Sequence, residues 1–431
     1  MNSTIPNIKQ LAPDAATFSR SKSLSKPEKW RLLQANTNLV WGECKSSGAQ
    51  YYKTVADLTD HTTYCTCPSR KVPCKHALAL LKLVYNQVEF FQMTEDAPTW
   101  VAENLAKRDA TPDPERVAQN EANVEKNKQK RLELMRIGFI ELERWLQDVF
   151  RQGLASLDSV DSEYWLDLSA RMVDAKLGSV GRRIKSLMYL QQQEQWHEVL
   201  LKELAELYLL AQGFKNLDQL PANLQTEILT TAGVNLRKQD VLNNSGVKDY
   251  WLVIGQTEGE EDNLNFRRTW LLSKQKQQFA LLLDFTWGNN AFEEEWEVGQ
   301  LFWGEVVYYP GNYPQRGIFK FFEKSEEPFD NFSGCVDFKD FQQRYAKIIA
   351  ANPWLTTTPA LLEDVIPIYN KNGELVLVDI LGKQIKVKMS GRSPWTLLAL
   401  SGGQPICLFG EWKNQTFIPL SSLAENRLIV L

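Results

Sequence analysis

The sequence predicts a multidomain α+β protein with a small N-terminal strand-strand-helix module, a helical middle domain and a β-rich C-terminal region. Its 431 residues are enough for several cores. The spacing of apolar residues changes from three and four to two after Ser245, which indicates helices followed by strands. With 43% hydrophobic and 24% charged residues, the composition excludes a disordered or collagen-like chain.

The N-terminal module is predicted over residues 36–92. Residues 1–35, rich in Ser, Pro and Lys, are expected to form an N-terminal extension along the surface. Residues 38–57 favour two short strands around a turn at Ser47-Gly48, because this stretch holds β-forming residues on both sides of the turn. Apolar residues at 78, 81, 84, 88 and 91 then predict a helix with one buried face.

The rest of the chain divides by composition and period. Residues 93–130 contain prolines and few large apolar residues, so they predict a charged linker that is partly helical at most. Residues 131–243 predict a helical domain whose first apolar stripe is core: Met135, Phe139, Leu142, Leu146 and Val149. Residues 244–352 predict a β-rich domain with one helical stretch. Residues 353–431 predict a C-terminal β-rich unit, with the segment TLLAL (396–400) as one of its strands.

Three cysteines and a histidine lie close together in the predicted module. Cys65, Cys67, Cys74 and His76 form the pattern C-x-C-x6-C-x-H, and thiolates and imidazole are the ligands that tetrahedral Zn²⁺ prefers. Side chains two residues apart in extended chain share a face, so the first two cysteines can chelate from the end of one strand. We therefore predict one structural Zn²⁺, since protein ligands fill all four positions. A chance cluster of thiols and a catalytic Cys-His pair are the alternatives.

This arrangement resembles the SWIM zinc finger, whose ligands would be these same four residues. The similarity extends over residues 36–90, and segments such as RMVDAK (171–176) and RRTWLL (267–272) look like those of full-length bacterial SWIM proteins. Such proteins are associated with MoxR-type AAA+ ATPases and von Willebrand factor A domain proteins. The finger itself is regarded as a DNA-binding or protein-interaction module. The resemblance thus implies a protein partner of one of these two kinds.

Charge is distributed unevenly along a chain whose formal net charge is −4. Residues 1–90 carry 12 Lys and Arg against 6 Asp and Glu, about +6, and the remainder carries 37 against 47, about −10. Arg70, Lys71 and Lys75 lie in the ligand loop. They could contact the phosphates of a nucleic acid or the surface of a partner, or they could offset the net −1 of a zinc ion with three thiolates. Arg182 and Arg183 predict either an anion site or a solvated helix face.

The remaining sequence features favour a non-enzymatic protein. Nucleotide-binding and hydrolase motifs such as G-x-x-x-x-G-K-[ST] and G-x-S-x-G do not occur, and three histidines leave little catalytic metal chemistry; His197 is expected to be structural. Without a long apolar run or a signal-like N-terminus, we expect a cytoplasmic location and no membrane partner. The favoured function is a zinc-binding interaction adaptor in an ATPase-linked assembly. The alternative is a DNA-binding protein that uses the basic finger.

Overall fold

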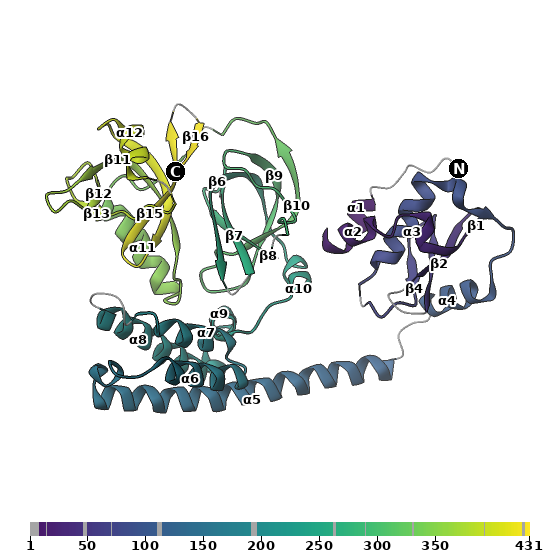
Figure 1. Ribbon diagram of the computed structural model, residues 1–431, viewed down its shortest axis with the longest axis horizontal. Helices are drawn as coiled ribbons and strands as arrows, with labels where there is room; N and C mark the ends of the chain where they lie inside the picture. Colours follow the sequence, from purple (N-terminus) through teal and green to yellow (C-terminus); the bar gives the residue numbers. More distant parts are fainter. Residues whose placement is uncertain are drawn as a thin grey trace. The chain divides into compact units, whose positions relative to one another are not determined.

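The computed structural model describes residues 8–13, 15–45, 50–69, 71–109, 114–190, 196–261, 264–288, 290–329, 332–391, 393–424 and 427–431. The chain divides into two compact units (Figure 1): unit 1 is Met1–Val124 and unit 2 is Glu125–Leu431. Unit 1 holds the predicted module. Unit 2 holds the helical and β-rich regions, so the predicted α+β fold class is confirmed.

A five-stranded sheet forms the centre of unit 1. Its order is β4-β3-β2-β1-β5, and the strands are β1 (Trp30–Ala35), β2 (Leu39–Lys45), β3 (Tyr51–Asp57), β4 (Thr63–Cys65) and β5 (Gln92–Met93). The first four pair antiparallel, and β5 runs parallel to β1 at the edge. The strand β1 comes from the stretch expected to be a surface extension. Trp30 and Ala35 are buried there, and the polar residues around them conceal this apolar contribution in the sequence.

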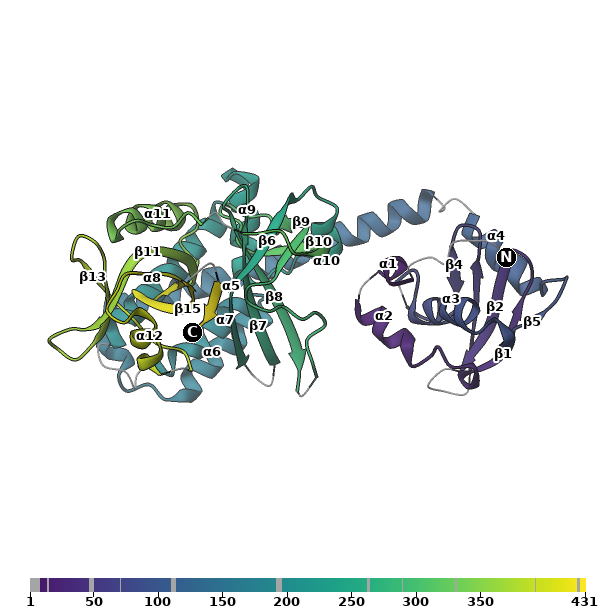
Figure 2. The ribbon, with the colours of Figure 1, turned by 90° about the horizontal axis from the view of Figure 1, so that it is seen from above.

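Helices cover both faces of this sheet. On one face, α3 (Lys75–Asn86) packs on β2 and β3 (Figures 1 and 2) and is covered in turn by α1 (Ile8–Leu11) and α2 (Ala15–Lys22). The ammonium of Lys82 in α3 donates to Ser21 Oγ in α2 at 2.6 Å. Because α1 and α2 cover it as well as the sheet, α3 is buried on more sides than its periodicity predicts. It ends at Asn86, and Val88–Phe90 forms a separate 3-10 turn. On the other face, α4 (Thr99–Asp109) contributes Val101 to a small cluster.

A helical bundle opens unit 2. It contains α5 (Pro114–Gln152), α6 (Ser162–Asp174), α7 (Gly178–Leu187), α8 (Trp196–Lys215), α9 (Ala222–Ala232) and α10 (Lys238–Leu242). The predicted stripe of α5, from Met135 to Val149, is buried in the bundle core. The stretch expected as a linker holds α4 and the beginning of α5. After Pro114 the sequence contains no proline up to residue 152, and its Glu, Lys, Gln and Ala residues are good helix formers, although Gln119 and residues 122–130 are exposed.

Two antiparallel sheets follow the bundle. The first has the order β10-β9-β6-β7-β8 and contains β6 (Val247–Glu261), β7 (Leu264–Ser273), β8 (Phe279–Trp287), β9 (Leu301–Tyr308) and β10 (Gly317–Ser325). The second has the order β13-β12-β11-β14-β15-β16 and contains β11 (Thr358–Tyr369), β12 (Leu375–Val378), β13 (Gln384–Lys386), β14 (Ile406–Lys413), β15 (Thr416–Ala424) and β16 (Arg427–Val430). Ile254 and Trp270 of the first sheet share an apolar cluster with Leu361, Phe409 and Leu420 of the second. The two predicted β regions therefore pack against each other.

Two helices accompany the second sheet. The predicted helical stretch forms α11 (Phe338–Ala351), which buries Phe338 and Phe341 against this sheet. The segment TLLAL, expected as a strand, instead lies in the helix α12 (Pro394–Ser401). Ser393 caps this helix, Pro394 starts it, and Gly402 ends it in the left-handed conformation at φ 54°. These end signals outweigh the apolar run of the segment.

Candidate metal centre and the groove beside it

The four predicted ligands meet where β4 and α3 approach each other. Cys65 ends β4, Cys67 follows two residues later, Cys74 is the N-cap of α3, and His76 lies in its first turn. Their donor atoms all lie within 4.8 Å of one another. The prediction that this loop would bring the four side chains together is therefore confirmed.

The distances fit a tetrahedral zinc ion. Nδ1 of His76 lies 3.8 Å from Sγ of Cys65 and 3.9 Å from Sγ of Cys74. Bonds of about 2.3 Å to sulfur and about 2.0–2.1 Å to nitrogen place these ligand atoms about 3.6 Å apart in a tetrahedron. Three thiols and one imidazole are also a donor set typical of structural zinc sites. The four residues are positioned to bind one zinc ion.

Neighbouring side chains hold the ligands in place. Thr54 Oγ1, in the adjacent strand β3, lies 3.1 Å from Sγ of Cys65, and the ring of Tyr52 lies 5.0 Å from that of His76. The hydrogen bond between Cys65 and Cys67 raises the pKa of the first thiol and lowers that of the second. Proton sharing of this kind favours thiolate at Cys67, which is the form that binds a metal.

A further thiol lies close to the centre without belonging to it. Cys44 in β2 is fully buried in the core of unit 1, and burial raises its pKa to about 11. It is therefore a neutral thiol at physiological pH. Its sulfur is not among the donor atoms that gather at the metal site. The pair Cys44 and Cys74 thus offers a comparison between a core thiol and a ligand thiol in the same unit.

A groove of about 780 Å³ borders the metal centre. Cys67 and His76 line it, together with five exposed cations: Arg20, Lys29, Lys45, Lys71 and Lys75. None of its described lining residues is acidic. The sequence indicates only the two lysines nearest the ligands, Lys71 and Lys75. The other three cations come from α2, from the 3-10 turn before β1 and from the end of β2. Arg70 lies outside the described residues.

The other residues considered in the sequence, Arg182, Arg183 and His197, lie in three different surroundings. Arg183 is not solvated as expected: it donates to both Glu203 and Glu206, at 2.8 and 2.6 Å. Arg182 is exposed and lines a different pocket. His197 Nε2 lies 2.7 Å from a carboxylate oxygen of Asp158 at the surface, and no metal-ligating cluster among the described residues includes it.

Two family models match the chain. Residues 57–85 match the SWIM zinc finger, and residues 130–232 match the SWIM-associated four-helix bundle domain. The first range contains all four ligands, and the second covers most of the bundle from α5 to α9. Comparison with curated proteins and with solved structures gives no match. Among the described helices, none combines the length and apolarity needed to cross a membrane.

Proposed function

We propose that the chain is a non-enzymatic zinc-binding interaction adaptor whose partner is a MoxR-type AAA+ ATPase or a von Willebrand factor A domain protein. The observation that carries the adaptor role is the closed metal centre: four protein ligands surround one position, and Cys74 and His76 are each 4% exposed. A catalytic zinc needs an open coordination position for water or substrate. The ion is therefore assigned to holding the binding module in shape.

The bundle supports a protein partner because it presents apolar side chains outward. On α6, Leu166 and Val173 are 44% and 49% exposed, and on α8, Leu201 and Tyr208 are 47% and 39% exposed. Each pair is seven residues apart, so its two members lie on the same face of their helix. Apolar side chains repeated along an exposed helix face are typical of an interaction surface. The two proposed kinds of partner are taken from the resemblance of the chain to bacterial SWIM proteins.

Affinity capture from a native lysate tests this function. The tagged full chain is expected to enrich an AAA+ ATPase or a von Willebrand factor A domain protein, identified by mass spectrometry. The double variant Leu201→Glu/Tyr208→Glu should lose that protein, whereas Lys202→Glu on the same helix should retain it. Absence of both protein classes from the wild-type capture would contradict the proposed partner. Equal capture by the double variant would exclude this face of α8.

DNA binding is the second candidate, and the cationic groove favours it. If each of the five described cations of the groove neutralises one phosphate, the slope of log affinity against log salt is about −4.5. The lysines Lys71 and Lys75 alone would give about −1.8. The structure thus supports a larger electrostatic footprint than the ligand loop indicates by itself. The overall charge of −4 opposes this attraction at long range.

A salt titration of duplex binding distinguishes the two functions. As an adaptor, the full chain should bind a mixed-sequence duplex only weakly at physiological salt. As a DNA-binding protein, it should show submicromolar affinity and a slope near −4.5. In that case Lys29→Glu/Lys45→Glu should weaken binding by at least tenfold. The matched control is Lys126→Glu/Lys128→Glu on the exposed part of α5, which lies outside the groove.

A further inference from the structure

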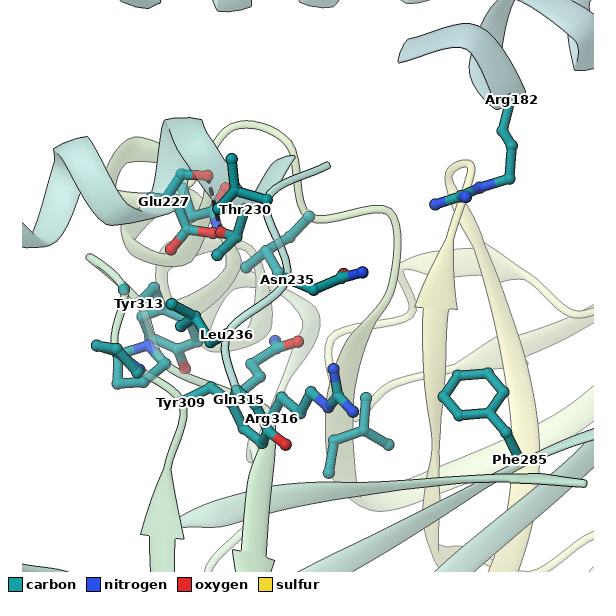
Figure 3. A pocket seen from close by; sticks show the side chains of 17 residues that line it. Arg182, Glu227, Thr230, Asn235, Leu236, Phe285, Tyr309, Tyr313, Gln315 and Arg316 are labelled. Atoms are coloured by element: carbon teal, nitrogen blue, oxygen red, sulfur yellow. Dashed lines mark hydrogen bonds between the residues drawn. The ribbon is translucent and has the colours of Figure 1, made fainter. Parts of the chain in front are cut away.

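Unit 2 contains a polar pocket of about 540 Å³ (Figure 3) that the proposed function does not use. Its wall is formed by α7, by the end of α9 with the segment that follows it, by β8, and by the loop between β9 and β10. The volume lies within the range of small-molecule sites. Figure 3 shows Arg182, Asn235, Gln315 and Arg316 placed around one space, with Phe285 at its side.

Two guanidinium groups face this pocket without acidic partners in the part of the chain that the structure describes. Among the described residues, neither Arg182 nor Arg316 has a carboxylate within ion-pair distance. Arg182 donates to Ser179 Oγ at 3.1 Å, and Arg316 lies over the ring of Tyr309 at 4.3 Å from its centre. Both contacts orient an arginine and leave its charge uncompensated. Guanidinium groups held in this way are suited to bidentate binding of a carboxylate or phosphate.

The one acidic residue among the described lining residues is already engaged. Glu227 accepts from the backbone N–H of Asn312 at 3.1 Å and so holds the loop between β9 and β10. A Cβ atom at Gly311 would lie 2.3 Å from the same carboxylate oxygen, so the loop backbone approaches this carboxylate closely. The carboxylate therefore serves the loop and does not neutralise the two arginines.

A buried amide adds an unused donor. Gln315 is 8% exposed and lines the pocket, and its Nε2 has no acceptor among the described residues. A buried donor without a partner costs free energy unless a bound group or an ordered water accepts its proton. The pocket thus has an excess of donors and positive charge, with aromatic walls at Tyr309, Tyr313 and Phe285.

We propose that this pocket binds a small organic anion, whose carboxylate or phosphate group lies between Arg182 and Arg316. The organic part of the ligand packs on the ring of Phe285, which is 53% exposed. Gln315 donates to the anionic group from the floor. The site lies entirely within unit 2 and is independent of the metal centre.

The test measures the melting temperature of unit 2 in the full chain at constant ionic strength. The probes are 10 mM inorganic phosphate, succinate and AMP, each compared with NaCl. For a Kd of about 0.1 mM the expected rise is about 5 °C. A rise in melting temperature with phosphate and AMP but not with succinate would identify a phosphate site. A rise with succinate only would identify a carboxylate site. A larger shift with AMP that Phe285→Ala removes would place the organic part on this ring.

Matched variants assign the effect to this pocket. Arg182→Gln and Arg316→Gln should each abolish the shift, whereas Arg136→Gln, an exposed arginine of α5 with the same charge change, should keep it. Lys71→Glu/Lys75→Glu should also keep it, since that variant alters only the groove of unit 1. The proposal is overturned if none of the three anions stabilises unit 2 beyond NaCl, or if Arg136→Gln loses the shift as fully as Arg316→Gln.

Discussion

Loss of the zinc ligand Cys74 should unfold unit 1 and leave unit 2 folded. Structural zinc contributes about 10–16 kcal/mol of apparent binding free energy in finger peptides. A small domain has a free energy of unfolding of about 5–15 kcal/mol in total. Removal of the ion therefore cancels most or all of the stability of unit 1. Unit 2 has its own cores in the bundle and the two sheets, and none of the four metal ligands belongs to it.

The helix content gives the size of the expected signal. The described helices that lie wholly within unit 1, α1 to α4, have 4, 8, 12 and 11 residues, 35 in all. Helix α5 crosses the unit boundary and is counted with the bundle, whose core holds its apolar stripe. The helices α5 to α12 have 39, 13, 10, 20, 11, 5, 14 and 8 residues, 120 in all. Complete unfolding of unit 1 should thus remove between a fifth and a quarter of the helical circular dichroism at 222 nm.

The assay combines zinc content with circular dichroism for Cys74→Ser and Cys44→Ser. The first variant should lose its zinc and this fraction of the signal. The second replaces a buried thiol that is not a ligand, so it should keep one zinc per chain at a cost of about 1–3 kcal/mol for the buried hydroxyl. Full zinc content in Cys74→Ser would refute the ligand assignment. Loss of most of the helical signal on chelation would show that the two units share one cooperative fold.

Three further perturbations test unit 2. Glu411→Ala should lower its free energy of unfolding by about 3–5 kcal/mol in urea melts, because the 1% exposed carboxylate accepts from Arg268 at 2.5 Å across the two sheets. Burial raises the pKa of Glu227, so its contribution to stability falls as the pH rises from its unfolded-state pKa through its folded-state pKa. The free energy of unfolding of the wild type minus that of Glu227→Gln should therefore fall as the melts move from pH 4.5 to 7. A difference that stays constant over this range would contradict the reasoning. Gly138→Ala should destabilise the bundle by about 1–3 kcal/mol, since its Cβ would lie 2.5 Å from Ala175 Cβ, whereas Gly178→Ala meets no atom within 4 Å and should not.

The metal centre could be predicted because its ligands are local in sequence. Cys65 and Cys74 are nine residues apart, and the helix after them can be identified from the spacing of its apolar residues. A short loop brings such ligands together by itself, with little help from residues far away in the sequence. The same argument explains why Lys71 and Lys75 were identified as site residues.

The groove and the pocket could not be predicted because distant segments form them. Arg20 and Lys29 precede the finger, and Lys45 ends β2. In unit 2, Arg182 and Arg316 are more than a hundred residues apart and meet only through packing of the bundle on a sheet. An anion site is one of the two sequence interpretations of Arg182, but nothing in the sequence marks Arg316 or the other cations of the groove as neighbours.

Hydrophobic spacing predicts the wrong element where two local patterns compete. The segment 396–400 has the apolar run of a strand, but Ser393, Pro394 and Gly402 supply a complete set of helix end signals around it. In the polar stretch after Pro114, Gln119 and residues 122–130 are exposed, so helix propensity decides the structure there. Helix end signals and helix propensity therefore predict these two segments better than hydrophobic spacing does.

The arrangement of unit 1 makes the cationic groove dependent on zinc. Lys71 and Lys75 lie in or beside the ligand loop, and the groove is closed on that side by Cys67 and His76. Because metal binding is coupled to folding, we expect the loop to lose its fixed position when the ion is removed, and the groove to lose one wall. Any DNA affinity should therefore disappear on chelation, together with the salt slope. Anion binding in unit 2 should persist in the same sample, because Arg182 and Arg316 are held by contacts within that unit. Loss of both activities on chelation would show that the pocket depends on unit 1, and survival of DNA binding would place the DNA site outside the groove.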